Sequence, residues 1–398
     1  MNILLYYQSI SLGGQQTQLL HLCREFSAMG HRVYWAYETG NHLLESIGQW
    51  ATPLQLEVLG SNWKKPRNRV SHLAAFGIKT LSRTTSLKKN IEQRGINLIV
   101  SSESYGSFIC GWASGRKQRQ FRLIGQDIEA LEHPWYQYYR ILQIDRFVEN
   151  YFGWPKVYAS LAKKGVANHK FANFQINAVD TTQFFPIDQA QRQQIRKSFG
   201  IAEDEIVIGW IGRLQERMQV KNTLKLGCLL RQRGFDKFKI LVVGGGVITN
   251  NDLEDQTYPT KLRGLTVEYD ITNQTVFTGW IPHHDINSYI NAMDVVPLLD
   301  DDPQGGSILR ETMACGRVAI SVNGPSGTQQ VFMTADNSIL LPTNDYIDAC
   351  ADAVIKLATD FAQIENMGKS ARDYCTNHLT FKGQAESIIN YYEKSKKC

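Results

Sequence analysis

Two cations and a glycine in the second half of the chain have the chemistry of a phosphate site. Gly212 ends the apolar run EIVIGWIG, Arg213 follows it, and Lys221 stands eight residues after the arginine. Arginine can hold two phosphate oxygens at once, and lysine adds a second point charge. Two cations leaving a predicted strand suit the diphosphate part of a ligand better than they suit surface decoration, where single charges are solvated.

A glycine-rich turn further along the chain leads directly into a short predicted helix. Gly305, Gly306, Ser307 and Ile308 open the stretch GGSILRETMACG, and Glu311 lies about one turn into the helix. The N–H groups at a helix start can bind a diphosphate, and a carboxylate one turn later can accept hydrogen bonds from ribose hydroxyls. The alternative is that Glu311 only complements the helix dipole.

The first predicted strand also runs into glycines. Gly13 and Gly14 come soon after the apolar run NILLYY, and a helical pattern of apolar residues begins behind them. A glycine turn before a helix start lets a phosphate approach the backbone closely. Two glycines after a strand are more often a tight turn, so this pattern alone leaves both interpretations open.

Alternating strand and helix patterns place these clusters at strand ends. Apolar runs of strand type occur in two sets, at residues 2–7, 32–37, 97–101 and 121–125 and then at 205–212, 239–246, 275–280, 294–299 and 316–322. Residues 221–233 and 307–315 are predicted helices of the second set. Successive strand–helix–strand units of this kind form parallel, doubly wound sheets. The predicted fold class is therefore α/β with two such sheets.

The two sets of strands predict two domains and a helical tail. The pattern is interrupted near residues 180–200, where Pro186 and the polar stretch DQAQRQQ stand. Interruptions of this kind mark domain boundaries. We therefore expect a first domain at 1–190, a second domain at 191–375, and a C-terminal helix at 376–398 that packs back on the first domain.

The composition is that of an ordinary folded protein. Of the 398 residues, 43% are hydrophobic and 20% are charged, and no apolar run approaches the ~20 residues that span a bilayer. The N-terminal apolar run lacks the preceding basic residues of a signal peptide. The seven cysteines are scattered without a C-x-x-C pair. This usage favours reduced thiols in the cytoplasm over disulfides or a zinc site.

The net charge of +5 is unevenly distributed along the chain. Residues 1–190 hold 21 basic and 13 acidic side chains, a net charge of +8, whereas the remainder has a net charge of −3. The basic excess is densest at residues 62–94, where nine Lys and Arg side chains are interleaved with apolar residues and Glu92 is the only acid. The segment predicts either contact with an anionic membrane surface or a solvated helix face.

Taken in order, these segments resemble glycosyltransferase family 4, the glycosyl transferases group 1 set. QINAVDTTQFFP is similar to the family's interdomain segment N-G-V-D-x-x-x-F-x-P, and IGWIGRL followed by Lys221 and Asn222 resembles its G-R-L…K-[GN] phosphate clamp. TVFTGWIPHHDINSYINAMDVVPLL is similar to the part that borders the nucleobase, and GGSILRETMACGRVAIS resembles the E-x7-E region. The resemblance covers nearly the whole chain. It implies the GT-B architecture, in which two Rossmann-like domains face a cleft.

The resemblance also implies roles for individual residues. Arg213 and Lys221 would bind the donor phosphates, Glu311 would bind the ribose, and Gln126 and Asp127 would complete the catalytic set. The implied donor-binding residues come from both halves of the chain: Gly13, Gly14, Gly212, Arg213, Lys221, Ile281, Gln304, Gly305, Gly306, Ser307, Ile308 and Glu311. Such enzymes are usually metal-independent and retaining, and the positive clamp stabilises the departing phosphate. No cofactor is implied, because the nucleotide sugar is a co-substrate.

Two departures from the family pattern concern the donor side. Lys221 follows Arg213 at a longer spacing than is usual in the family. The first glutamate of E-x7-E is replaced by Pro303, and only Asp302 or Gln304 could take over its contacts to the donor sugar.

A third departure lies in the first domain. The His-Asp pair of many retaining members is Gln126 and Asp127 here. Gln126 can hydrogen-bond a sugar, but it cannot shuttle a proton as histidine does. His133 is a candidate substitute, although a lone histidine among aromatic residues is more often structural. These departures leave open a non-catalytic nucleotide-binding protein of the same fold.

The predicted function is sugar transfer from a nucleotide diphosphate sugar to a glycan or lipid-linked acceptor, in the biosynthesis of a cell-surface polysaccharide or glycolipid. We expect a cytoplasmic protein, peripheral on the inner membrane face, with no nucleic acid partner. The alternative within catalysis is a metal-dependent transferase using Asp300 and Asp302, because an Asp-x-Asp after a strand can hold a divalent cation. A nicotinamide dehydrogenase is not expected, since Gly244, Gly245 and Gly246 lack the G-x-G-x-x-G spacing.

Overall fold

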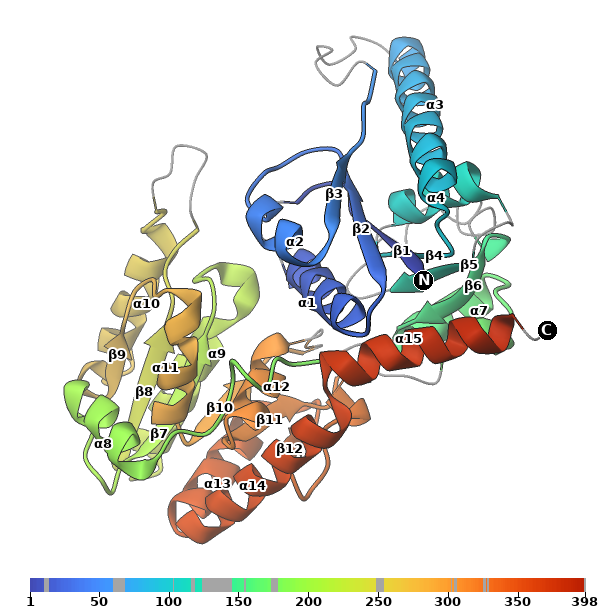
Figure 1. Cartoon of the computed structure of the whole chain (residues 1–398). Helices are drawn as coiled ribbons and strands as arrows, with labels where there is room; N and C mark the ends of the chain where they lie inside the picture. Colours follow the sequence, from blue (N-terminus) through green and yellow to red (C-terminus); the bar gives the residue numbers. More distant parts are fainter. Residues whose placement is uncertain are drawn as a thin grey trace. The chain divides into compact units, whose positions relative to one another are not determined.

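The computed structural model describes residues 1–10, 14–59, 69–102, 104–115, 119–123, 145–153, 155–172, 178–247, 254–301, 303, 306–324, 327 and 329–396. The chain divides into two compact units, the first comprising Met1–Ile176 and Phe381–Cys398 and the second comprising Asn177–Thr380. Each unit contains one six-stranded sheet flanked by helices (Figure 1). No helix in the described part combines the length and the hydropathy that a membrane span requires.

The sheet of the first unit has the strand order β3-β2-β1-β4-β5-β6, and all neighbouring strands pair in parallel. The strands are β1 (Asn2–Tyr6), β2 (Arg32–Tyr37), β3 (Thr52–Gln55), β4 (Leu98–Ser101), β5 (Arg119–Leu123) and β6 (Val148–Phe152). The α-helices described in this unit are α1 (Gly14–Ala28), α2 (Leu44–Trp50), α3 (Arg69–Arg94), α4 (Ser104–Ser114), α7 (Pro155–Lys163) and α15 (Phe381–Ser395). Helix α15 comes last in the sequence and packs against α1, where the rings of His21 and Phe381 stack at 4.4 Å.

The second unit repeats this topology with the order β12-β11-β10-β7-β8-β9, again with parallel neighbours. Its strands are β7 (Ile206–Ile211), β8 (Phe238–Val243), β9 (Thr275–Phe277), β10 (Val295–Leu298), β11 (Val318–Val322) and β12 (Ser338–Leu341). Its α-helices are α8 (Gln189–Ser198), α9 (Val220–Gln232), α10 (Thr257–Glu268), α11 (Ile286–Ala292), α12 (Ser307–Ala314), α13 (Tyr346–Ala358) and α14 (Phe361–His378). Numbered within each unit, both orders are 3-2-1-4-5-6, the doubly wound order of dinucleotide-binding domains. The predicted α/β fold with two Rossmann-like sheets is confirmed.

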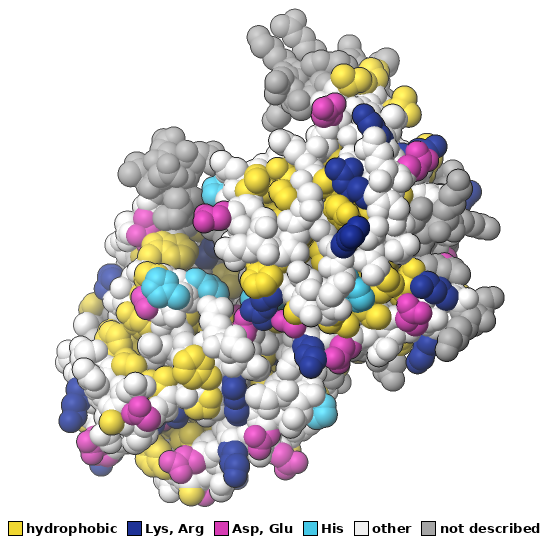
Figure 2. All heavy atoms as spheres, in the orientation of Figure 1, with side chains coloured by type: hydrophobic (Ala, Val, Ile, Leu, Met, Phe, Trp, Pro, Cys, Tyr) yellow, Lys and Arg dark blue, Asp and Glu magenta, His cyan; other side chains and the backbone are white. Residues whose placement is uncertain are grey.

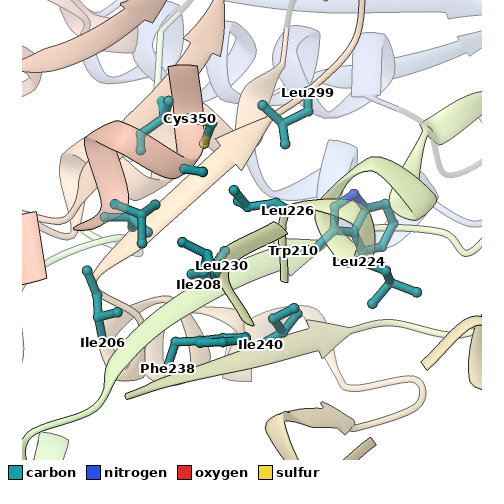
Figure 3. Packing of buried hydrophobic residues seen from close by; sticks show 14 of the residues in the cluster. Ile206, Ile208, Trp210, Leu224, Leu226, Leu230, Phe238, Ile240, Leu299 and Cys350 are labelled. Carbon is teal, nitrogen blue, oxygen red and sulfur yellow. The ribbon is translucent and has the colours of Figure 1, made fainter. Parts of the chain in front are cut away.

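The core of the second unit explains why its strands are continuous apolar runs. Ile206 and Ile208 of β7 pack with Leu224 of α9 in one buried cluster, which Figure 3 shows in close-up. Val207 belongs to another cluster, where it packs with Met293. Because successive side chains of a strand point to opposite faces, a sheet covered on both faces needs apolar side chains at every position.

The expected strands all occur, and three further strands were not expected. These three, β3, β6 and β12, lie at the edges of their sheets. Strand β3 contains Pro53, and β6 contains the polar residues Glu149 and Asn150. Proline and polar side chains are tolerated at edges, where one side of the strand makes no ladder, so edge strands carry a weaker apolar signal.

The chain passes into the second unit after residue 176, earlier than expected. Asn287 and Asn291 of α11 accept hydrogen bonds from backbone N–H groups of the segment 178–187 at 3.0 and 3.1 Å. Arg372 of α14 donates to two carbonyl oxygens of the same segment at 2.7 and 3.2 Å. The interruption at Pro186 therefore lies in an irregular segment inside the second unit. Polar side chains hold it there, so the pattern of apolar residues in the sequence could not predict that it belongs to the second unit.

Candidate functional site

The strand order of the second unit places a topological switch point between β7 and β10, which are neighbours in the middle of the sheet. From β7 the chain continues to β8 and β9 on one side of the sheet, and from β10 it continues to β11 and β12 on the other. In open parallel sheets, ligands bind outside the carboxyl ends of the strands at such a switch point. Gly212 and Arg213 follow β7, while the segment 299–306 follows β10 and leads into α12. The phosphate residues predicted in this unit therefore flank the switch point.

Two glycine turns at this edge are in direct backbone contact. Gly212 follows β7 with φ +149°, and Gly244 follows β8 with φ +131°. A Cβ atom on Gly244 would lie 1.9 Å from the carbonyl oxygen of Gly212, so only glycine fits there. The N–H of Leu214 donates to the carbonyl oxygen of Gly245 at 2.7 Å. The turn after β8 thus supports the turn that carries Arg213.

Arg213 and Lys221 have no counter-charge among the described residues. Arg213 is exposed, and Lys221 is half-buried as the second residue of α9. Neither side chain has an ion pair or hydrogen bond within the described ranges. By contrast, Arg233, directly after the same helix, pairs with Asp348 at 2.9 Å and with Asp352 at 2.6 Å. Cations left without a carboxylate at a switch point are available to an anionic ligand.

Asn222, the neighbour of Lys221, joins the two sides of the switch point. Its Nδ2 donates to the carbonyl oxygen of Leu299, directly after β10, at 2.9 Å and to Tyr346 Oη at 3.3 Å. The asparagine is only 6% exposed, so these bonds are shielded from water. Asn222 therefore fixes the start of α9, and Lys221 with it, relative to the segment that leads to α12.

The turn before α12 suits an anion. Gly306 directly precedes the helix, and a Cβ atom there would lie 2.9 Å from the side chain of Leu298. Ser307, the first helical residue, is exposed. The first N–H groups of a helix have no acceptor within the helix and carry partial positive charge. This helix start therefore presents N–H donors at the end of β10.

Glu311 lies one turn further along α12 and is half-buried. The Ser307 hydroxyl donates a hydrogen bond to its carboxylate. Burial raises the pKa of Glu311 above its usual value, while the charge of Arg310 and the hydrogen bond from Ser307 act in the opposite direction. A carboxylate in this position can accept hydrogen bonds from ligand hydroxyls.

Two of the predicted donor residues belong largely to the core. Ile281 and Ile308 are half-buried and pack against the cluster that contains Val207. Trp280, beside Ile281, is 45% exposed, and its Nε1 donates to the carbonyl oxygen of Gly246 at 3.1 Å. A ligand contact of either isoleucine stays a prediction. No separate signal in the sequence marked Trp280.

Several predicted residues lie outside the described residues, and their roles stay predictions: Gly13, Gln126, Asp127, His133, Asp302, Gln304 and Gly305. Gly14 is described only as the first residue of α1.

Asp300 and Asp301, which follow β10, interact with the first residue of α13. The Tyr346 hydroxyl donates a hydrogen bond to the Asp301 carboxylate, and Asp300 is close enough to act on the same phenol electrostatically. Within the described ranges, no three His, Cys, Asp or Glu side chains are grouped so as to hold a metal ion. The alternative metal site of Asp300 and Asp302 stays untested, since Asp302 lies outside these ranges.

A hollow of the second unit lies near the amino ends of its strands, away from the switch-point residues. It is lined by residues of α8 and α14, among them Arg192 and Arg196. Both arginines pair with Asp294, which directly precedes β10. The hollow is therefore at the amino end of β10, whereas the predicted donor residues are at its carboxyl end.

Comparisons with known proteins agree with this picture. The family model described as glycosyl transferases group 1 matches residues 191–374. A D-inositol 3-phosphate glycosyltransferase of Kribbella flavida is 26% identical over 199 residues, which are 49% of this chain and 45% of that protein. A 2-deoxystreptamine glucosyltransferase of Streptomyces kanamyceticus is 23% identical over 206 residues, covering 52% and 50% of the two chains. The alignments thus span about half the length of these curated relatives.

Solved structures match over nearly the whole chain. HepE of Anabaena, in complex with UDP, aligns with a TM-score of 0.79 and 13% identity over 99% of this chain and 100% of that chain. Sucrose-phosphate synthase of Thermosynechococcus elongatus aligns with a TM-score of 0.73 and 18% identity over 100% and 99% of the two chains. These likenesses establish the fold. They show that the chain has the GT-B fold, and residues 191–374 within this fold match the model of the glycosyl transferases group 1 family.

Proposed function

We propose that this chain transfers a sugar from a nucleoside diphosphate sugar to a glycan or lipid-linked acceptor. The observation that carries the proposal is that Arg213 and Lys221 have no counter-charge in the described ranges and follow β7, the strand that pairs with β10, after which α12 begins. The family match over residues 191–374 supports the same function. A further support is that HepE, a structural neighbour, was solved in complex with UDP-glucose.

In the proposed reaction, the acceptor hydroxyl oxygen forms a new bond to the anomeric carbon as the bond from that carbon to the diphosphate oxygen breaks. The departing diphosphate gains negative charge, and the acceptor proton passes to it or to water. Arg213, Lys221 and the N–H groups at the start of α12 stabilise that charge most strongly in the transition state, which lowers the barrier. Glu311 accepts hydrogen bonds from the ribose and orients the nucleotide. Since these groups supply positive potential at the leaving group, we propose that transfer needs no metal. By family resemblance we propose that it retains the anomeric configuration.

The first test is thermal stability in the presence of UDP, GDP, ADP, CMP and their sugar conjugates. A ligand that binds only the native state stabilises it by ~2.7 kcal/mol at a hundred times its dissociation constant. We expect one diphosphate to stabilise the protein and this effect to vanish in Arg213→Ala. The matched control is Lys225→Ala, which removes an exposed cation from α9 and should keep the effect. Failure of every nucleotide to stabilise the protein would contradict the proposal.

The second test is turnover with the donor identified in this way. Release of the diphosphate together with formation of a glycosylated product would support transfer. Nuclear magnetic resonance of the product reports the configuration at the anomeric carbon, and inversion would contradict the proposed retention. Loss of turnover with EDTA, restored by a divalent cation, would replace the metal-independent proposal by the metal-dependent alternative.

We also propose that the acceptor is presented at an anionic membrane surface that contacts α3. Ile78 and Leu81 of α3 are 43% and 68% exposed, and Lys88 and Lys89 are exposed further along the helix. Leu59, whose N–H donates to Ser82 Oγ of α3, is 68% exposed. Figure 2 shows hydrophobic side chains near Lys and Arg side chains where Figure 1 draws α3. Exposed apolar residues beside cations are typical of interfacial helices. A cytoplasmic protein on the inner membrane face, acting in the synthesis of a cell-surface polysaccharide or glycolipid, would use such a surface.

Sedimentation with vesicles tests this contact. We expect binding to vesicles that contain phosphatidylglycerol, weaker binding to neutral vesicles, and loss of binding as salt rises. Leu81→Ser should weaken binding by removing apolar area. Val267→Ser, at a position 70% exposed on the second unit, should not. Failure to bind anionic vesicles at low salt would contradict the membrane contact and leave the transfer reaction untouched.

A further inference from the structure

Tyr346 is the first residue of α13 and has no part in the reaction proposed above. Its Oη accepts a hydrogen bond from Asn222 Nδ2 at 3.3 Å and donates one to the Asp301 carboxylate. Asn222 also holds the carbonyl oxygen of Leu299 at 2.9 Å. Three hydrogen bonds therefore join α9, α13 and the segment after β10. Helices α9 and α13 also pack directly on each other.

Both helices start from unfavourable backbone conformations. Gln219, directly before α9, has φ +52°, and Asp345, directly before α13, has φ +53°. Asp270 is the third and last described non-glycine residue with positive φ. Such conformations cost energy and persist where the surroundings fix them, often next to functional groups. The two strained residues precede the helix starts that carry Asn222 and Tyr346.

At neutral pH, the donor and the acceptor in each hydrogen bond of Tyr346 are defined. Burial raises the pKa of Tyr346 to about 12, and the hydrogen bond to Asp301 and its charge act in the same direction. The phenol therefore stays protonated and donates to Asp301 while it accepts from Asn222. A hydrogen bond to an ionised carboxylate is stronger than one between neutral groups. The order of donation is Asn222 to Tyr346 to Asp301.

We propose that Tyr346 is a positioning residue for donor binding. Its hydroxyl holds the described residues after β10, 299–301 and 303, against the start of α9, which keeps Lys221 and the N-terminus of α12 at the separation that a diphosphate needs. Gln329 supports the same segment, since its Nε2 donates to the carbonyl oxygen of Pro303 at 2.7 Å. The inference rests on the proposed donor site and adds to it a residue that no motif marks.

Tyr346→Phe removes only the hydroxyl and is the decisive variant. We expect the dissociation constant of the nucleoside diphosphate to rise about tenfold in titration calorimetry with UDP, GDP and ADP, measured well below the melting temperature. Tyr289→Phe is the matched control, because Tyr289 is a half-buried tyrosine of α11 with no hydrogen bond from its hydroxyl within the described residues. It should bind within twofold of the unmodified protein.

A double variant separates positioning from a purely structural role. If Tyr346 acts by placing Lys221, the effect of Lys221→Ala on the dissociation constant should shrink at least threefold in the Tyr346→Phe background. Independent effects would multiply instead. Should Tyr346→Phe fail to fold, Asp301→Asn weakens the same hydrogen bond from an exposed position and takes its place.

The outcomes are distinguishable. A dissociation constant within twofold of the unmodified protein in Tyr346→Phe, or effects of Tyr346→Phe and Lys221→Ala that multiply, would overturn the inference while the donor site stands. An unmodified protein that binds none of the three diphosphates would overturn the proposed function itself.

Discussion

The two units share one strand order but differ in the polar groups at their strand ends. In the first unit, Tyr6 at the end of β1 donates to Glu38 at 2.9 Å, and Arg83 of α3 pairs with the same carboxylate at 2.7 Å. Arg83 also donates to Tyr105 Oη at 2.9 Å. In the second unit, Arg213 has no such partner among the described residues. Arg83 is therefore bonded inside the fold, whereas Arg213 is exposed and, in the proposed function, binds the donor diphosphate.

This difference shows that a topological switch point alone does not establish a ligand-binding site. The ion pair of the first unit is largely buried, with side-chain exposures of 13% for Arg83 and 4% for Glu38. It anchors α3 to the end of β2. Function has to be argued from the residues at each switch point, because the shared topology is the same in both units.

The largest expected effect is on the stability of the first unit. Arg83→Met should lower the free energy of unfolding by about 3–5 kcal/mol, because it leaves the buried carboxylate of Glu38 without its cation. Urea denaturation measures this change. The double variant Arg83→Met/Glu38→Gln should recover much of the loss, since it removes the stranded charge. A single variant as stable as the unmodified protein would mean that the pair does not anchor α3.

The matching variant of the second unit should affect function instead. Arg213→Ala should lower kcat/KM for the donor by about 10²–10³-fold, or ~2.7–4 kcal/mol of transition-state stabilisation, because it removes a cation at the leaving group. The free energy of unfolding should change by less than ~0.5 kcal/mol, since the side chain is exposed and makes no described contact. Lys225→Ala should leave both quantities nearly unchanged. A large stability loss in Arg213→Ala would remove the contrast between the two arginines.

A third prediction concerns the paired glycine turns of the second unit. Gly244→Ala should lower the free energy of unfolding by about 1–3 kcal/mol and weaken diphosphate binding, because its Cβ would meet the backbone of Gly212 at 1.9 Å and its φ is +131°. Gly264→Ala on α10 is the control. A Cβ atom there meets nothing within 4 Å, so alanine should stabilise the helix by about 0.5–1 kcal/mol. Equal effects of the two variants would show that the turns do not depend on close contact.

Most of the fold could be predicted because buried parallel strands leave a strong apolar signal. The run EIVIGWIG became β7, and β10 and β11 were equally clear. The edge strands β3 and β6 were missed because Pro53 interrupts the first and Glu149 and Asn150 interrupt the second, and β12 was missed because it has only four residues. The boundary near residue 176 was missed as well, because polar side chains such as Asn287 and Asn291 hold the segment after it.

Only those residues of the candidate site whose side-chain chemistry suits a ligand could be predicted from the sequence. Arg213, Lys221 and Glu311 could be singled out because their side-chain types suit a diphosphate and a ribose. Tyr346 could not, since its role depends on a hydrogen bond with Asn222, which is 124 residues away in the sequence. Such partners become visible only when the helix starts are placed in space.

The smallest expected effect is a change in pH dependence at α12. The pKa of Glu311 is raised in the folded state by burial, so the folded protein binds its proton more tightly than the unfolded chain does. Stability contributed by this group is therefore lost as pH rises from the unfolded pKa through the folded one. Glu311→Gln cannot titrate, so its free energy of unfolding relative to the unmodified protein should increase between pH 4 and pH 7 in urea denaturation.

An unchanged difference between pH 4 and pH 7 would contradict burial as the main cause of the shift. Diphosphate binding provides the functional side of the same variant. If the ionised carboxylate accepts hydrogen bonds from the ribose, Glu311→Gln should be more stable at neutral pH and yet bind the nucleotide more weakly. Stability and binding that move in opposite directions would identify Glu311 as a buried acid that the second unit retains for its ligand. Glu38 of the first unit differs, because it is paired with Arg83 inside the fold.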